Sequence, residues 1–282
     1  MQQLQLTYPI VIKVPSGFST TGVFVCTNEE EATKALNSII EKTGPDGRTV
    51  KMALLEEYIN GTEFAINLMA FSSGEDRLLV TDMWKYQKNN KARYDSAEIC
   101  NPENYPELVS YACDVARSVG VRYGAAHVEL KARQDENGKY FDPVMIEVGA
   151  RLSGGRKSTM AQAAIDDWNP FTSLIESHCG LSCQRIPKNI NCLTPNRFVR
   201  HTFLPVEKAG IIKEVRFDET IISNLSTIHS SVIIVKEGDI VEETTDIVSC
   251  AGFVWLVGEK TQVDKDTMTV LDSFSLILKE EE

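Results

Sequence analysis

The sequence lacks the features that mark membrane proteins, secreted proteins and general nucleic-acid binders. No apolar run approaches the roughly 20 residues that span a bilayer, and the first residues lack the charged, apolar and small-residue order of a signal peptide. Lys and Arg number 29 against 40 Asp and Glu, a net charge of −11. Because nucleic acids and anionic membranes favour basic surfaces, we expect neither as a partner. We expect a cytoplasmic protein in which any anionic ligand is bound by a local group of cations.

Paired cysteines and sequence repeats are also missing. The seven cysteines are odd in number and widely scattered, in a chain of 282 residues that is large enough to fold without disulfides. Cys179 and Cys183 are four apart beside His178, but no second Cys/His pair with zinc-like spacing follows. We therefore expect reduced thiols that pack as small apolar side chains, and no zinc site.

What the sequence does contain is a strong hairpin pattern between Gly124 and Gly155. Two runs of extended-favouring residues, Ala126–Ala132 and Val144–Ala150, flank a polar connection that contains Asn137-Gly138, a strong turn signal. If Gly138 lies near the centre of the turn, Glu129 and Glu147 face each other.

Two facing carboxylates indicate a cation site. Side chains alternate along a strand, so His127, Glu129 and Lys131 share one face, and Glu147, Gly149 and Arg151 share one on the partner strand. Like charges opposite each other are destabilising unless a cation offsets them. Mg²⁺ prefers a few carboxylates together with waters and phosphates, and the Arg151 guanidinium suits phosphate oxygens. A solvated charged hairpin, neutralised by Lys131 and Arg151, accounts for the same residues.

Four further segments have the composition of ligand-binding segments. Lys13 interrupts the β-rich run Tyr8–Val14, and the following glycine-rich loop, Ser16–Cys26, can bring N–H groups against phosphates. A plain surface hairpin is the more common explanation of such a loop, because Gly, Ser and Thr dominate turns for conformational reasons alone. The strand Ala53–Ile59 carries a double glutamate, and Lys85–Asn101 is a basic segment that suits a mobile loop over a site or a solvated basic loop.

Helical periodicity is interrupted by capping and turn residues in the rest of the chain, and short β-like runs follow Arg197. The first predicted helix begins at Thr27 or Asn28 and ends before Gly44. Three more are predicted over Pro106–Val119, Ser158–Ile165 and Pro170–Cys179. After Arg197 the runs VRHTFLPV, GIIKEV, SSVIIV and GFVWLV predict a small β-rich subdomain, with a strand or amphipathic segment over Met268–Lys279.

Five of these segments together resemble a known family. Lys13 in VIKV, the loop SGFSTTGV, LLEEYINGTEF, HVELK and IEVGARLSGG have the order and approximate spacing seen in ATP-grasp enzymes. The chain resembles an ATP-grasp carboxylate-amine ligase, particularly the L-amino-acid ligase type, between Tyr8 and Gly180. The resemblance implies an α+β ATP-grasp fold, with antiparallel sheets and packed helices, plus a small C-terminal β-rich subdomain. It implies a partial nucleotide-binding subdomain at 1–60, a subdomain with the Mg/phosphate hairpin at 61–186, and the β-rich subdomain at 187–282.

The resemblance also implies an activity and a set of roles. In this family a carboxylate is phosphorylated by Mg-ATP to an acyl phosphate, which an amine then attacks. Carried over, Glu129 and Glu147 bind Mg²⁺, or Mn²⁺ in its place, Arg151 stabilises the transferring phosphoryl group, and the N–H groups around Ser153, Gly154 and Gly155 hold the acceptor carboxylate. The residues that contact ATP are then Lys13, Ser16, Thr20, Thr21, Gly22, Glu56, Glu57, Tyr58, Ile59 and Glu63. The resemblance implies amino acids as the carboxylate and amine substrates.

Two departures from the family pattern leave other functions open. Position 149 is glycine where many members have asparagine, a ligand of the second metal. Members also carry an N-terminal α/β domain and a further lysine-bearing strand before the position of Lys13, and the sequence shows neither. The alternatives are therefore a nonenzymatic ATP-binding or partner-binding remnant that needs a separate N-terminal polypeptide, and an ATP-grasp carboxylase. A homodimer is a further expectation.

Overall fold

A computed structural model describes residues 6–15, 17, 22–44, 47–71, 77–88, 93–181, 186 and 191–279. The chain forms two compact units. The first comprises residues 1–60 with 244–249, and the second comprises 61–243 with 250–282. Each unit is described by itself.

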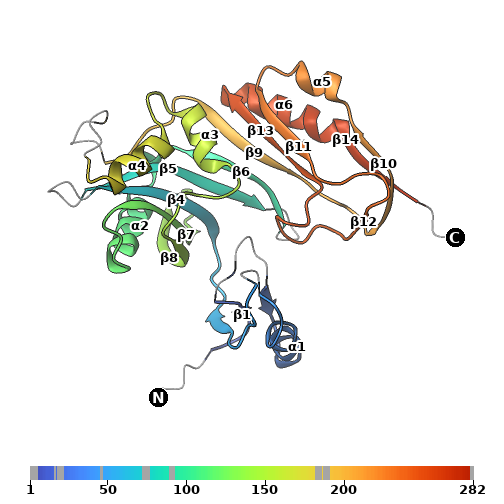
Figure 1. The fold of residues 1–282 in the computed structure, drawn as a ribbon, viewed down its shortest axis with the longest axis horizontal. Coiled ribbons are helices and arrows are strands. Elements are labelled where there is room, and N and C mark those ends of the chain that lie inside the picture. Colours follow the sequence, from blue (N-terminus) through green and yellow to red (C-terminus); the bar gives the residue numbers. More distant parts are fainter. Residues whose placement is uncertain are drawn as a thin grey trace. The chain divides into compact units, whose positions relative to one another are not determined.

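The first unit is a helix packed on a three-stranded antiparallel sheet (Figure 1). Its strands, β1 (Ile10–Lys13), β2 (Val23–Cys26) and β3 (Leu54–Glu57), lie in the order β2-β1-β3. Helix α1 (Glu29–Ile39) begins after Asn28, whose side chain accepts a hydrogen bond from Glu31 N at 3.0 Å, as the sequence predicts. The buried Ala32, Ala35 and Ile39 form the helix face that meets the sheet.

The second unit is built on an antiparallel sheet of eight strands in the order β11-β13-β9-β6-β5-β4-β7-β8 (Figure 1). The strands are β4 (Thr62–Phe71), β5 (Arg77–Lys88), β6 (Tyr94–Cys100), β7 (Gly124–Gln134), β8 (Tyr140–Gly149), β9 (Phe198–Leu204), β11 (Ile228–Ile233) and β13 (Gly252–Gly258). A smaller sheet has the order β12-β10-β14, with β10 (Gly210–Phe217), β12 (Ile240–Val241) and β14 (Phe274–Leu278). The helical segments are η1 (Pro102–Asn104), α2 (Pro106–Ser118), α3 (Lys157–Ala164), α4 (Pro170–His178), α5 (Glu219–Ser223) and α6 (Lys260–Ser273).

The two faces of the large sheet have different roles. Helix α2 covers one face, where Leu108 and Ala112 pack against Phe64, Val128 and Leu130 in a dry core. Helices α3 and α4 lie on the opposite side of the same strands (Figure 1). The alternate residues of β4, β5 and β7 face this second side, and they include the buried polar residues Asn67, Asp82 and His127 as well as Ala65 and Trp84. The sheet therefore separates an apolar core from a face that carries buried polar groups, the polar face.

The central hairpin, β7 and β8, confirms the predicted pairing and corrects the predicted turn. Glu129 lies opposite Glu147 and His127 opposite Gly149, but two register shifts separate these pairs from the turn, where Gln134 lies opposite Tyr140. The turn is not centred on Gly138. It is closed by a hydrogen bond from Asp135 N to Lys139 O at 2.9 Å. The prediction placed the centre of the turn at Gly138, which is wrong. The two β-bulges shift the register between the turn and the glutamates, so that Glu129 and Glu147 still face each other.

Other sequence expectations are corrected by pairing that is distant in sequence. The predicted loop over Lys85–Asn101 is wrong over its described residues, because β5 continues to Lys88 and β6 begins at Tyr94. Residues 89–92 lie outside the described residues. The C-terminal segment contains helix α6, which sequence reasoning missed, before β14. The α+β class with antiparallel sheets is confirmed. Strand β9 pairs with β6, so the predicted segments 61–186 and 187–282 share one sheet, and the three-part division stays a prediction.

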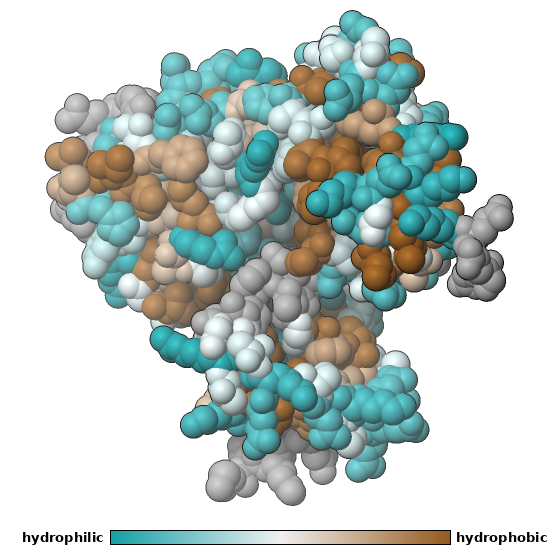
Figure 2. All heavy atoms as spheres, turned by 45° about the vertical axis from the view of Figure 1, so that its right-hand side comes forward, coloured by the Kyte–Doolittle hydropathy of each residue, from teal (hydrophilic) through white to brown (hydrophobic). Residues whose placement is uncertain are grey.

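The molecular surface is mixed in polarity. Figure 2 shows one face on which apolar side chains are exposed among charged ones. In the C-terminal part of the chain, exposed apolar residues include Ile211, Ile234 and Ile240. Within the described residues, no helix has both the length and the apolar character needed to cross a bilayer.

Gly61, at the start of the second unit, is required by close backbone packing. A Cβ atom at this position would lie 2.4 Å from the carbonyl oxygen of Ala132, and the backbone has a φ of +139°. We expect Gly61→Ala to lower the free energy of unfolding by about 2 kcal/mol or more, because backbone cannot move aside as a side chain can. Gly47→Ala, at a positive φ with open space around it, is the matched control. Urea denaturation measures both, and equal losses would contradict the steric explanation.

Candidate nucleotide and metal site

The facing glutamates of β7 and β8 lie on the polar face of the large sheet. Glu129 is largely buried, whereas Glu147 is exposed. Among the described residues no group of three or more His, Cys, Asp or Glu side chains is placed to hold a metal by itself. Two carboxylates, one of them open to solvent, fit Mg²⁺, which completes its coordination with waters and phosphate oxygens.

Glu129 is held by two donors on one of its oxygens. His127 Nε2 lies 3.1 Å from Glu129 Oε1, and the Tyr86 hydroxyl donates to the same oxygen at 3.3 Å. Burial raises the pKa of Glu129, but the hydrogen bond and charge of His127, with Lys157 and Tyr86, outweigh it and hold this pKa below its usual value. Glu129 is thus kept ionised, with Oε2 directed away from both donors and available to a cation.

A buried polar chain orients His127. Asn67 on β4 donates to Asp82 on β5 through Nδ2, so its Oδ1 faces His127 Nδ1, 2.7 Å away. Because an amide oxygen only accepts, Nδ1 carries a proton and Nε2 is the atom that meets Glu129. Asp82 also accepts from Trp84 Nε1 at 2.7 Å and from Thr81 Oγ1 at 2.9 Å. Burial raises the pKa of Asp82 although these hydrogen bonds lower it. The chain was not predicted from the sequence.

Arg151 lies beside Gly149, at the end of the strand that carries Glu147. Its Nη1 donates to Leu152 O at 3.0 Å, and its side chain passes 3.5 Å from the place that a Cβ atom on Gly149 would occupy. The guanidinium stem therefore covers Gly149, where many ATP-grasp enzymes have an asparagine. The exposed Arg151 side chain is near the metal carboxylates, but its role toward a phosphoryl group stays a prediction.

The glycine-rich segment after β8 forms a tight turn before α3. Gly155 and Arg156 have φ values of +61° and +59°, and Lys157 N donates to Gly154 O at 3.2 Å. The N–H groups of Ser153, Gly154 and Gly155 donate to none of the described residues. These donors fit an anionic group, as the sequence predicts for a substrate carboxylate, but that role is not tested by the geometry alone.

Two residues that sequence reasoning missed lie next to this turn. Lys157 is 6% exposed and His201 on β9 is 3% exposed, and both ring nitrogens of His201 lack a hydrogen bond within the described part of the chain. Burial lowers the pKa of Lys157, opposed mainly by Glu129 and Asp82, and burial also lowers the pKa of His201 well below its usual value. A helix pattern could have found Lys157, because it shares the buried stripe of α3 with Met160, Ala161 and Ala164.

Glu63 lies on the same face of the sheet. Its two oxygens accept from Tyr94 Oη at 2.7 Å and from Lys88 Nζ at 2.9 Å. Lys88 also lies over the Tyr94 ring at 4.0 Å. Both carboxylate oxygens thus have a protein partner, and each retains further accepting capacity, so binding of ribose hydroxyls by Glu63 stays a prediction.

The remaining predicted nucleotide residues lie in the first unit. Lys13 Nζ forms an ion pair with Glu56 Oε2 at 2.6 Å, across the β1–β3 ladder. Gly22 closes the β1–β2 hairpin through a hydrogen bond from Val14 N at 3.2 Å, whereas Ser16, Thr20 and Thr21 lie outside the described residues. Glu57 is exposed, and Tyr58 and Ile59 follow β3 directly.

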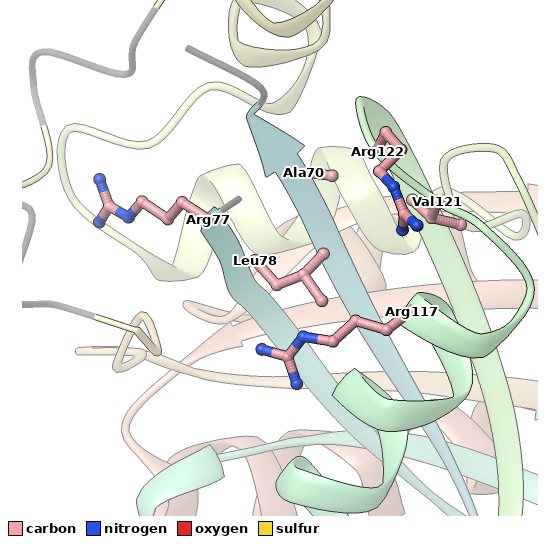
Figure 3. Close-up of a pocket in the computed structure, with 6 residues that line it drawn as sticks. All are labelled: Ala70, Arg77, Leu78, Arg117, Val121 and Arg122. Atoms are coloured by element: carbon pink, nitrogen blue, oxygen red, sulfur yellow. The ribbon is translucent and has the colours of Figure 1, made fainter. Parts of the chain in front are cut away.

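A separate cavity of about 230 Å³ at the other end of β4 contains none of the predicted site residues. It is lined by Ala70, Arg77, Leu78, Arg117, Val121 and Arg122. Figure 3 shows that the three arginines come from β5, α2 and the segment before β7, and that their guanidinium groups point in different directions. They do not converge on one anion, so the candidate site remains the polar face near Glu129.

The polar face thus carries paired carboxylates, a nearby guanidinium and a glycine turn, which are group types that suit a metal-bound phosphate. The comparisons with known proteins specify the class. The chain belongs to the ATP-grasp family, whose domain matches residues 6–160.

One relative is named a synthase, and two fold neighbours are an L-amino acid ligase and a carboxylase domain by name. The chain is 30% identical to dapdiamide A synthase of Enterobacter agglomerans over 153 residues, which cover 52% of this chain and 34% of that protein. Its fold is similar to that of an L-amino acid ligase from Bacillus licheniformis, with a TM-score of 0.74, 19% identity and coverage of 98% of this chain and 65% of that one.

The biotin carboxylase domain of 2-oxoglutarate carboxylase from Hydrogenobacter thermophilus, solved with MgADP and bicarbonate, has a TM-score of 0.62 and 17% identity, covering 96% of this chain and 58% of that one. At these identities the structures establish the fold alone. The chain spans about a third of dapdiamide A synthase and less than two thirds of either structure.

Proposed function

We propose that the chain is the nucleotide- and metal-binding part of an ATP-dependent carboxylate-amine ligase that acts on amino acids. The observation that carries the proposal is the pair Glu129 and Glu147, which face each other on the polar side of an ATP-grasp sheet. The similarity to dapdiamide A synthase over 153 residues favours ligation over carboxylation. The carboxylase likeness is one of fold only.

In the proposed reaction a substrate carboxylate oxygen attacks the γ-phosphorus of ATP. The bond from that phosphorus to the ADP oxygen breaks, and an acyl phosphate forms. An amine then attacks the acyl carbon, phosphate leaves, and the amine loses a proton. Mg²⁺, held by Glu129 Oε2 and Glu147, supplies charge neutralisation for the phosphates when it is bound. Mn²⁺ can take the same ligands.

The protein contributes position and charge, because phosphoryl transfer requires little covalent chemistry from a protein. Arg151 balances charge on the transferring phosphoryl group. The N–H groups of Ser153, Gly154 and Gly155 hold the acceptor carboxylate. The ATP contacts proposed for the first unit are Lys13, Gly22, Glu56 and the backbone of Glu57, Tyr58 and Ile59.

An ADP-release assay with Mg-ATP and pairs of amino acids tests this function. We expect ADP release that requires both Mg²⁺ and at least one amino acid, with phosphate formed in equal amount. Binding of Mg-ATP without ADP release from any pair contradicts an active ligase in this chain, and favours a nucleotide-binding module that needs a separate N-terminal polypeptide. A bicarbonate-dependent release without amino acids favours a carboxylase instead.

A further inference from the structure

Lys157 is a buried ammonium group without an ionic partner. It is 6% exposed, and within the part of the chain that the structure describes no carboxylate oxygen lies within 4.0 Å of Nζ. Its nearest described interaction is with the Tyr86 ring, whose centroid lies 5.0 Å away. Burying an unpaired charge is costly, and proteins retain such groups where a ligand supplies the opposite charge.

Lys157 Nζ points at the glycine turn. It lies 3.4 Å from the place that a Cβ atom on Gly155 would occupy, and the His201 ring approaches the same point, with Cε1 at 3.7 Å and Nδ1 at 3.9 Å. Gly155 has no side chain to fill this place. Its carbonyl oxygen is turned away and accepts from Trp255 Nε1 at 3.3 Å. A cation and an unpartnered imidazole therefore converge on one position beside the free N–H groups of the turn.

His201 is fixed in this place by aromatic packing. Its ring stacks on Trp255 at a centroid distance of 4.6 Å and an interplanar angle of 15°, and it contacts Phe203 at 4.5 Å. A neutral imidazole has one donor and one acceptor nitrogen, and neither is used by a described residue. A ligand that reaches Lys157 can therefore also form a hydrogen bond with His201.

The same lysine lies between the glycine turn and the metal carboxylate. The Tyr86 ring below Lys157 Nζ belongs to the residue whose hydroxyl donates to Glu129 Oε1 at 3.3 Å. On one side of Lys157 lie the two carboxylates proposed to bind Mg²⁺, which suit phosphates. On the other side lie neutral and cationic donors, which suit a carboxylate. An acyl phosphate carries both a phosphoryl and a carboxyl group, so it can contact both sides.

We propose that Lys157 binds the substrate carboxylate at the point of its phosphorylation and then the acyl phosphate formed from it, with the Gly155 turn and His201 as the neighbouring contacts. The proposal rests on the proposed ligase function and deepens it, since it places the acceptor carboxylate on a cation as well as on backbone N–H groups. A lysine serves here as a compact point charge that can follow the oxygen as its charge changes.

The test uses acetylphosphonate, a stable mimic of an acyl phosphate, titrated calorimetrically into the full chain with and without MgADP. We expect Lys157→Met to weaken acetylphosphonate binding at least about tenfold, because a hydrogen bond to a charged group is lost. Lys157→Arg keeps the charge and should recover part of the affinity. The affinity for MgADP should fall by a smaller factor than the affinity for acetylphosphonate in both variants, because Glu129 keeps its contacts with His127 and Tyr86.

Lys265→Met on the exposed side of α6 makes the same chemical change as the control, and it should leave both affinities unaltered. Circular dichroism checks folding, since methionine replaces a buried lysine readily. Equal acetylphosphonate affinity in wild type and Lys157→Met overturns the proposal, as does an absence of binding to the wild type. Failure of the ligase function is seen separately, as a wild type that binds acetylphosphonate but releases no ADP with any amino acid.

Discussion

Glu147→Gln is expected to lower Mg-dependent ADP release by about 100-fold or more, and to weaken Mg-ATP binding at least about tenfold. Glu147 is exposed, so the substitution removes a negative charge without disturbing the core. An amide keeps one oxygen but loses the charge that holds a divalent cation next to phosphates. Glu129→Gln is a less clean probe, because it also disrupts the contacts of His127 and Tyr86.

Titrations of ATP at millimolar Mg²⁺ and in EDTA separate the role of the metal from general binding. Glu147→Gln should weaken ATP binding in the titration with Mg²⁺ and leave it unchanged in the titration with EDTA. Glu136→Gln, in the exposed turn of the same hairpin, makes the same change away from the site and should behave as wild type. If metal-dependent nucleotide affinity is the same in the Glu147 variant and in wild type, the facing carboxylates are not the magnesium site.

Asp82→Ala is expected to lower the free energy of unfolding by about 3 kcal/mol or more. The change leaves three buried donors, on Asn67, Thr81 and Trp84, without the oxygen atoms that accept from them. A buried donor without an acceptor costs about 1–3 kcal/mol. Urea denaturation followed by tryptophan fluorescence reports on this unit, because all three tryptophans, Trp84, Trp168 and Trp255, belong to it.

The sign of the pH dependence follows from burial. Burial raises the folded-state pKa of Asp82 above the ordinary value of 3.8 for this group, so its favourable contribution to stability is complete below pH 3.8 and is lost as the pH rises through the folded-state pKa. The difference in free energy of unfolding between wild type and Asp82→Ala should therefore become smaller as the pH rises from 3.8. Asp114→Ala, on the exposed surface of α2, is the control and should cost about 0.5 kcal/mol or less. An Asp82 variant as stable as this control would show that the polar chain does not stabilise the unit.

The sequence allowed the β7–β8 hairpin and its facing glutamates to be predicted because the information for them is local. A turn, two alternating strands and a pair of glutamates lie within one stretch, and the family resemblance then added Lys13 and Glu63. Local patterns also predicted the capping of α1 by Asn28. These features depend on residues a few positions apart, where periodicity and turn chemistry are informative.

Residues that meet across distant strands could not be found in this way. Asn67 and Asp82 face each other only because β4 pairs with β5 in the register that places these two residues opposite each other. His201 reaches the glycine turn because β9 pairs with β6, a contact between residues about a hundred positions apart in the chain. The same pairing turned a predicted basic loop into strands, so tertiary pairing overrode local polarity.

The register shifts divide the β7–β8 hairpin into two parts whose strand pairing is constrained differently. On the sheet side of the bulges, every pair is fixed, because a slip of one residue would send Glu129 or Glu147 into the apolar core. On the turn side, the pairing has its own register and the tip around Glu136 is exposed. A change of length or composition at the tip therefore leaves the pairing of the two carboxylates in place.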